Sequence, residues 1–175
     1  MNILLLNWLF CLFTLLLGPL LHFVRKITNN KIALIFGATN ESTWEHLKLL
    51  FWPMAISFLP EYLIYGNRIP CFIQARVISI LLGILFIICF FYTYTGILGK
   101  NLLPVDIATF ILGTLSAYLY SQNAYLYTPT PYCSVTNNLL HLSLFFALVF
   151  AFVLFTFRPP KIGLFYDYSQ NKYGV

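Results

Sequence analysis

Side chains that can do chemistry gather in one short stretch of the sequence, residues 40–48, which holds two glutamates, a histidine and a lysine. Glu45 and His46 are adjacent, so on a helix their side chains diverge by about 100° and share a ligand only if another segment closes over them. His22 and Asp106 belong to segments that we expect at a compatible depth, at the same end of the molecule. The candidate ligand-binding residues are Glu41, Glu45, His46, His22 and Asp106.

Some of these residues are also candidate metal ligands, because imidazole nitrogens and carboxylate oxygens bind zinc, manganese and iron. We take Glu45, His46 and His22 as the metal candidates. The sequence contains neither an H-E-x-x-H nor an H-x-x-x-H spacing, so it identifies no particular metal or other cofactor. Structural networks also gather charged groups, and that interpretation stays open.

The same stretch has a purely structural interpretation as the start of a helix. Ser42 followed three residues later by Glu45 is a capping box, which satisfies the free amides of a first helical turn. Trp44 and Trp52 would anchor that helix at a membrane interface, and Lys48 would extend its charge toward water. Capping and ligand binding are therefore both compatible with this pattern.

A second polar group is expected at the opposite face and consists of Glu61, Arg76 and His141. Ionisable side chains inside membrane spans are costly, and pairing them lowers that cost. We therefore expect a salt-bridged structural cluster, with a gate or a proton site as the alternative. Pro53 and Pro60 free backbone carbonyls in the second span, which also keeps a transport role open.

The four cysteines contain no C-x-x-C motif, which argues against a thioredoxin-like redox site or a zinc ribbon. Cys71 and Cys133 lie in loops that we expect on the outer side, where an oxidising environment would allow a disulfide. Sequence alone does not show that the two sulfurs meet, so the paired and unpaired forms both stay open.

The elements that position these groups follow from composition. The chain has 175 residues, of which 60% are hydrophobic and only 9% are charged, and its mean hydropathy is +0.82. A soluble domain carries roughly a quarter charged residues. This composition excludes a soluble enzyme, a coiled coil, a disordered tail and a disulfide-stapled miniprotein, and it indicates a single integral membrane domain covering residues 1–175.

The hydrophobic pattern predicts an all-α integral membrane bundle of five transmembrane helices, since about 20 apolar residues cross a bilayer. A short re-entrant or interfacial segment, residues 32–36, precedes the second span. A polar, aromatic cytoplasmic tail occupies residues 158–175, and it either lies on the inner membrane surface or folds back over the first polar group. The predicted spans are residues 3–24, 43–65, 72–95, 104–121 and 138–157.

The distribution of lysine and arginine predicts the orientation of the bundle. Eight lie on one side of the predicted spans and two, Arg68 and Arg76, on the other. The side with eight should be cytoplasmic, which puts the N-terminus outside and the C-terminus inside. The net charge of +5 is then a topology signal and no nucleic-acid footprint, because no basic helix or stripe accompanies it. The lipid bilayer is the expected partner, and a protein partner or a homo-oligomer stays open.

Residues 40–48, continuing as Leu-Leu-Phe-Trp-Pro-Met to residue 54, resemble the signature of an uncharacterised bacterial family of small multi-pass membrane proteins with a domain of unknown function. The tail residues 164–167 and the ending 173–175 resemble the closing motif of that family. The resemblance covers nearly the whole chain. It implies the span count, a bacterial plasma membrane, and Glu41, Glu45 and His46 as positions to test, but no activity.

Three functional hypotheses follow. The first is a non-enzymatic transport or assembly component that binds a small ligand or ion at its cytoplasmic face. The second is a membrane-embedded metal-dependent enzyme, with Glu45 as general base and His46 as a metal ligand. The third is a purely structural membrane protein in which residues 40–48 only cap a helix. No nucleotide-binding or serine-hydrolase motif is present, and whether the protein is an enzyme stays open.

Overall fold

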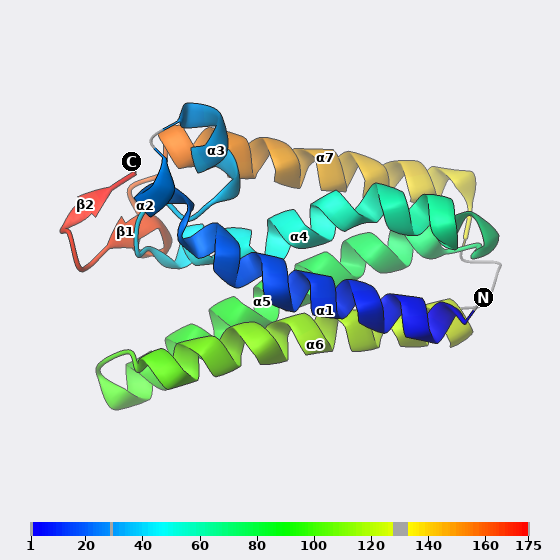
Figure 1. Cartoon of the computed structure of the whole chain (residues 1–175), viewed down its shortest axis with the longest axis horizontal. Helices are drawn as coiled ribbons and strands as arrows, with labels where there is room; N and C mark the ends of the chain where they lie inside the picture. The colour runs from blue at the N-terminus through cyan, green and yellow to red at the C-terminus, as the bar shows by residue number, and fades with distance from the viewer. Residues whose placement is uncertain (1, 29, 128–132, 175) are drawn as a thin grey trace.

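The long helices lie side by side along the long axis of the molecule (Figure 1). The computed structural model describes residues 2–28, 30–127 and 133–174. Within these ranges, five helices are long and apolar enough to cross a membrane. They confirm the predicted all-α bundle. Their bounds are α1 Ile3–His22, α4 Thr43–Ile64, α5 Phe72–Leu98, α6 Leu103–Tyr127 and α7 Val135–Phe157.

The helix ends differ from the predicted spans because caps, and not hydrophobic length, decide where a helix stops. The first span was predicted to reach residue 24, but α1 ends at His22 and the chain restarts as α2, Val24–Ile27. α5 continues past residue 95 to Leu98 and is followed by Gly99, whose φ of 68° is the left-handed conformation typical of a helix C-terminus. α6 continues six residues beyond Ser121, and α7 begins three residues before Asn138, after its Ser134 cap.

Except for η1 (Gly66–Arg68), which connects α4 to α5, the short elements gather at one end of the bundle, where the C-terminus also lies, whereas the N-terminus lies at the other end (Figure 1). They include α2, the six-residue α3 (Lys31–Phe36), and the segment after α7, which contains η3 (Gly163–Phe165). That segment ends in an antiparallel hairpin of β1 (Tyr166–Asp167) and β2 (Lys172–Tyr173). Because a six-residue helix is about 9 Å long, α3 cannot cross a bilayer, as the sequence predicts.

Close packing inside the bundle relies on small residues and stacked rings. A Cβ atom added to Gly113 of α6 would lie 2.7 Å from Ile87 of α5, so only a glycine lets these two helices approach so closely. Phe51 of α4 stacks on Phe152 of α7 with ring centroids 4.2 Å apart. The outward surface of the helices is apolar, as at Leu16, which is 62% exposed. Such a surface indicates contact with membrane lipid.

Candidate metal centre

Three potential metal ligands meet at the end of the bundle that carries the short elements. His22 is the last residue of α1, Glu41 lies in the loop before α4, and His46 lies in the first turn of α4. One ligand atom from each of these side chains lies within 4.8 Å of the other two. The sequence-based candidates therefore come together in part, with Glu41 in the place that we had assigned to Glu45.

The loop that carries Glu41 reaches α1 because Gly37 permits it. A Cβ atom on Gly37 would lie 2.4 Å from Val24 Cβ and 2.8 Å from the Leu21 carbonyl oxygen, so any larger residue would push the loop away. The next residue fixes the contact, since the Ala38 N–H donates a hydrogen bond to the Leu21 carbonyl at 3.2 Å. The α3–α4 loop is thus held against the C-terminal end of α1.

The predicted capping box is half formed. Ser42 is the N-cap of α4, and its hydroxyl accepts a long hydrogen bond, 3.4 Å, from the Glu45 N–H. The reciprocal bond is replaced, because the Ser42 N–H donates to Asn40 Oδ1 at 2.9 Å. The Glu45 carboxylate instead accepts from both the N–H and the hydroxyl of Thr39, each at 2.8 Å.

Glu45 is a structural residue in this arrangement. Its carboxylate lies 2.7 Å from the Lys48 ammonium, and both side chains are buried. The ammonium also donates to the carbonyl oxygens of Leu34 at 3.2 Å and Gly37 at 3.4 Å. This pair fastens the α3–α4 loop to α4, which supports the ligand cluster without joining it.

His46 and Glu41 face each other in a geometry that favours a proton or a metal ion between them. The Nδ1 atom of His46 lies 2.9 Å from the Ser42 carbonyl oxygen, and because a carbonyl only accepts, Nδ1 must carry the proton. In the neutral ring, Nε2 then presents a lone pair, yet it lies 3.4 Å from Glu41 Oε2, another acceptor. Two facing acceptors repel each other unless a proton or a metal ion lies between them.

His22 supplies the third potential metal ligand of this cluster, a ring nitrogen. Its ring centroid is 5.3 Å from that of His46. The His22 Nδ1 atom is buried and has no hydrogen-bond partner within the described ranges of the chain. A buried nitrogen without a partner costs about 1–3 kcal/mol, a penalty that an ion bound to Nδ1 would remove.

Charge and exposure also suit an ion that arrives from water. The facing His46 ring lowers the pKa of Glu41, although partial burial opposes this shift, so the carboxylate is ionised at neutral pH. Its side chain is 53% exposed and that of His46 is 38% exposed, which leaves the site open to solvent. Asp106 lies outside the cluster: its carboxylate accepts hydrogen bonds from Tyr94 and Asn101.

The C-terminal segment returns to the loop that carries Glu41. The Glu41 N–H donates to Asp167 Oδ2 at 3.0 Å, and the Asn40 side-chain amide donates to the Gly174 carbonyl at 2.9 Å. The Trp44 ring packs on Phe165 with centroids 4.7 Å apart. The tail therefore folds back onto the segment around the cluster, as we had considered from the sequence.

The second polar group forms a buried network near the opposite end. Arg76 Nη2 pairs with Glu61 Oε1 and donates to the Tyr118 hydroxyl at 2.8 Å. The Tyr65 hydroxyl donates to the other Glu61 oxygen at 2.6 Å. His141 makes its hydrogen bond elsewhere, with the Asn137 carbonyl one turn earlier in α7. The ion pair thus forms as expected, and the two tyrosines take the place that we had assigned to His141.

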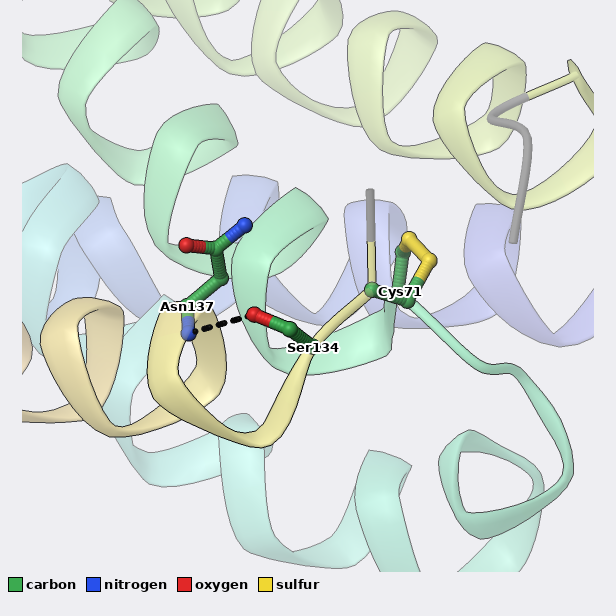
Figure 2. Close-up of a disulfide and its surroundings, with 4 residues drawn as sticks. Cys71, Ser134 and Asn137 are labelled. Carbon is green, nitrogen blue, oxygen red and sulfur yellow. Dashed lines mark hydrogen bonds between the residues drawn. A yellow bond between two sulfur atoms is a disulfide. The ribbon is translucent and has the colours of Figure 1, made fainter. Parts of the chain in front are cut away.

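A disulfide joins Cys71, just before α5, to Cys133, just before α7 (Figure 2). The two Cα atoms are 5.0 Å apart. Next to the bridge, the Ser134 hydroxyl accepts a hydrogen bond from the Asn137 N–H at 3.1 Å and caps α7 (Figure 2). The bridge lies at the end of the bundle opposite the histidine and glutamate cluster.

Comparison with known protein families shows to which family this chain belongs. The model of DUF6512, a family of unknown function, matches residues 5–175. The chain belongs to this family. The match confirms the expectation of an uncharacterised family and brings no activity with it. No curated protein and no solved structure matches the chain.

Sequence reasoning missed two residues that the structure links to the cluster. Thr39 holds the Glu45 carboxylate, and Asp167 holds the main chain of Glu41. Asp167 had a usable signal, because it is a lone acidic residue in an aromatic tail for which folding back was one of the two alternatives. Thr39 had none, because a threonine before a helix cap is common in loops.

Proposed function

We propose that this membrane protein binds a divalent metal ion, with zinc as the best match, through His22, Glu41 and His46. The observation that carries this proposal is the 3.4 Å separation between His46 Nε2 and Glu41 Oε2, two atoms that both act as acceptors when the imidazole is neutral. Ligand atoms about 2.1 Å from a tetrahedral zinc ion lie about 3.4 Å from each other. The gap therefore has the width that a zinc ion requires.

The hydrogen bond at His46 Nδ1 supports the same proposal. Histidines that bind metals usually donate their other ring N–H to a carbonyl or a carboxylate, which fixes the ring and leaves the second nitrogen free for the metal. His46 does this through the Ser42 carbonyl. The competing explanation is a proton on Nε2, which would make a simple imidazolium–carboxylate pair, and metal binding distinguishes the two.

Three protein ligands leave one tetrahedral position open, as in catalytic zinc sites. This count favours a metal-dependent enzyme as the second candidate function, in which the metal would lower the pKa of a bound water. Glu45 does not suit the role of general base in such an enzyme, because Lys48 and Thr39 hold its carboxylate. The first candidate, a transport or assembly component that binds an ion, requires no such base.

The metal centre would face the cytoplasm of a bacterial cell. Seven of the eight lysines and arginines assigned to the inner side belong to segments at the end of the cluster, and the eighth, Lys48, is buried beside it. Cytoplasmic loops carry such an excess of positive charge. The Cys71–Cys133 bridge at the opposite end fits an oxidising exterior. A reporter that fluoresces only in the cytoplasm, fused after Val175, tests this orientation. A fusion protein that is produced but does not fluoresce would contradict it.

The metal proposal is tested by metal analysis of protein purified in detergent from zinc-supplemented cells. We expect about one zinc per wild-type chain, lost in His22→Ala, Glu41→Gln and His46→Ala. The matched control is His141→Ala, which removes a histidine at the other end of the bundle and should keep the zinc. A folded wild-type protein that takes up no zinc, also on titration at micromolar concentrations, would overturn the proposal.

A further inference from the structure

The C-terminal hairpin reaches the metal ligand Glu41 through its main chain. Residues 41 and 167 are 126 positions apart, yet the Glu41 N–H donates to Asp167 Oδ2 at 3.0 Å. One residue earlier, Asn40 binds the Gly174 carbonyl. Two consecutive residues of the ligand-bearing loop therefore depend on the two ends of the hairpin for their hydrogen bonds.

Asp167 is itself held rigidly, although its side chain is short and acidic. It is fully buried. Its Oδ1 atom accepts hydrogen bonds from the Ser169 N–H at 2.8 Å, the Ser169 hydroxyl at 2.6 Å and the Gln170 N–H at 3.1 Å. These bonds occupy one oxygen and direct the other, Oδ2, at the Glu41 amide.

Aromatic packing fixes the segment before the hairpin to the transmembrane helices. Phe165 lies between Trp44 of α4 and Phe155 of α7, with ring centroids 4.7 Å and 5.4 Å away. Trp44 in turn stacks on Phe152 of α7 at 4.4 Å. Asp167, two residues after Phe165, therefore approaches Glu41 from a framework that the bundle itself holds in place.

We propose that Asp167 is a positioning residue for the metal ligand Glu41, so that metal binding and docking of the C-terminal hairpin are energetically coupled. This inference rests on the proposed metal function. Glu41 belongs to a loop, and its side chain is half exposed, so its direction depends on how its main chain is held. Asp167 holds that main chain, and its negative charge near the site also favours a cation. Coupling is reciprocal, so a bound metal should secure the hairpin by the same factor by which the hairpin tightens metal binding.

The test compares the zinc affinity of the full-length protein with that of Asp167 variants, measured by competition with a chromophoric chelator. Loss of a residue that orients a metal ligand typically weakens metal binding 10–100-fold, and we expect this for Asp167→Ala. Asp167→Asn keeps an acceptor oxygen without the charge and should fall between Asp167→Ala and the wild type. Gln170→Ala is the matched control, since its side chain is exposed and only its main chain contacts Asp167; its affinity should equal that of the wild type.

Two further readouts separate positioning from a general loss of stability. The visible spectrum of bound cobalt(II) reports the ligand geometry, and it should change in Asp167→Ala but remain unchanged in Gln170→Ala. Trypsin cleavage after Lys172, in β2, reports hairpin docking. Zinc should slow this cleavage in the wild type and leave it unchanged in His46→Ala.

The outcomes distinguish this inference from the function on which it rests. If the wild type binds zinc and both Asp167 variants bind it equally well with the same cobalt spectrum, the positioning role is overturned and the metal site stands. If zinc binds but leaves cleavage after Lys172 unchanged, the coupling is overturned. If the folded wild type binds no zinc, the metal function fails first and this inference fails with it.

Discussion

The Lys48 ammonium and the Glu45 carboxylate form a fully buried ion pair, 2.7 Å apart, one turn into α4. The ammonium also binds the carbonyls of Leu34 in α3 and of Gly37 after it, and the carboxylate binds Thr39. These contacts tie α3 and the α3–α4 loop to the start of α4. The pair therefore serves the neighbouring ligand cluster by fixing the loop that carries Glu41.

We expect Lys48→Met to lower the free energy of unfolding by about 3–5 kcal/mol, because it leaves the Glu45 carboxylate buried without its counter-charge. Denaturant titration in detergent, followed by circular dichroism, measures the change. The double variant Glu45→Gln/Lys48→Met removes both charges and should be more stable than Lys48→Met alone. If the two substitutions are simply additive, the pair is not coupled and the loop is held in another way.

Metal affinity should fall as the pH falls, because protons compete with the metal for the imidazoles of His22 and His46. Affinity should be highest where both rings are neutral. It should drop by up to about 100-fold per pH unit once the pH is low enough for both rings to bind a proton. Zinc titrations of the wild type between pH 5 and pH 8 check this, with His141→Ala expected to follow the same curve. A flat profile would exclude histidine ligands.

The fold was largely predictable because it depends on the average chemistry of long segments. Five runs of about 20 apolar residues specify five spans regardless of their exact contacts. The ends of the helices were less predictable from hydrophobicity. A helix such as α6 continues through aromatic and polar residues that are not apolar enough to count as part of a membrane span. Single capping residues decide other ends, as Gly99 does after α5 and Ser134 does before α7.

The site was predictable in its residue types but not in its membership. Glu41 and Glu45 are both acidic residues beside a helix start, and only Glu45 fits the capping box. What separates them in the structure is the groups that they meet: Lys48 and Thr39 bind Glu45, whereas the loop path set by Gly37 brings Glu41 to His46. No local pattern records that path, just as none records the contact between Asp167 and Glu41.

Gly37→Ala should damage stability and metal binding together. The added Cβ would lie 2.4 Å from Val24 Cβ, and overpacking of this kind costs about 1–3 kcal/mol. Relief of the clash moves the loop away from α1, so Glu41 moves away from His22 and zinc affinity falls. Gly96→Ala is the matched control, because a Cβ there meets nothing within 4 Å. Unchanged zinc affinity in Gly37→Ala would show that the loop path does not control the site.

The disulfide gives a prediction that thiol counting can check. Wild-type protein, denatured without reductant, should expose two thiols, Cys11 and Cys89, and all four after reduction. Cys71→Ser should expose three thiols under the first condition, because Cys133 loses its partner. The bridge closes a 62-residue separation, which in the chain-entropy model stabilises a soluble protein by about 4 kcal/mol. We expect a smaller loss of stability here, because spans that stay in the lipid already restrict the unfolded chain. Four thiols in the unreduced wild type would show that the end with the N-terminus does not face an oxidising compartment, which would contradict the orientation proposed for the metal centre.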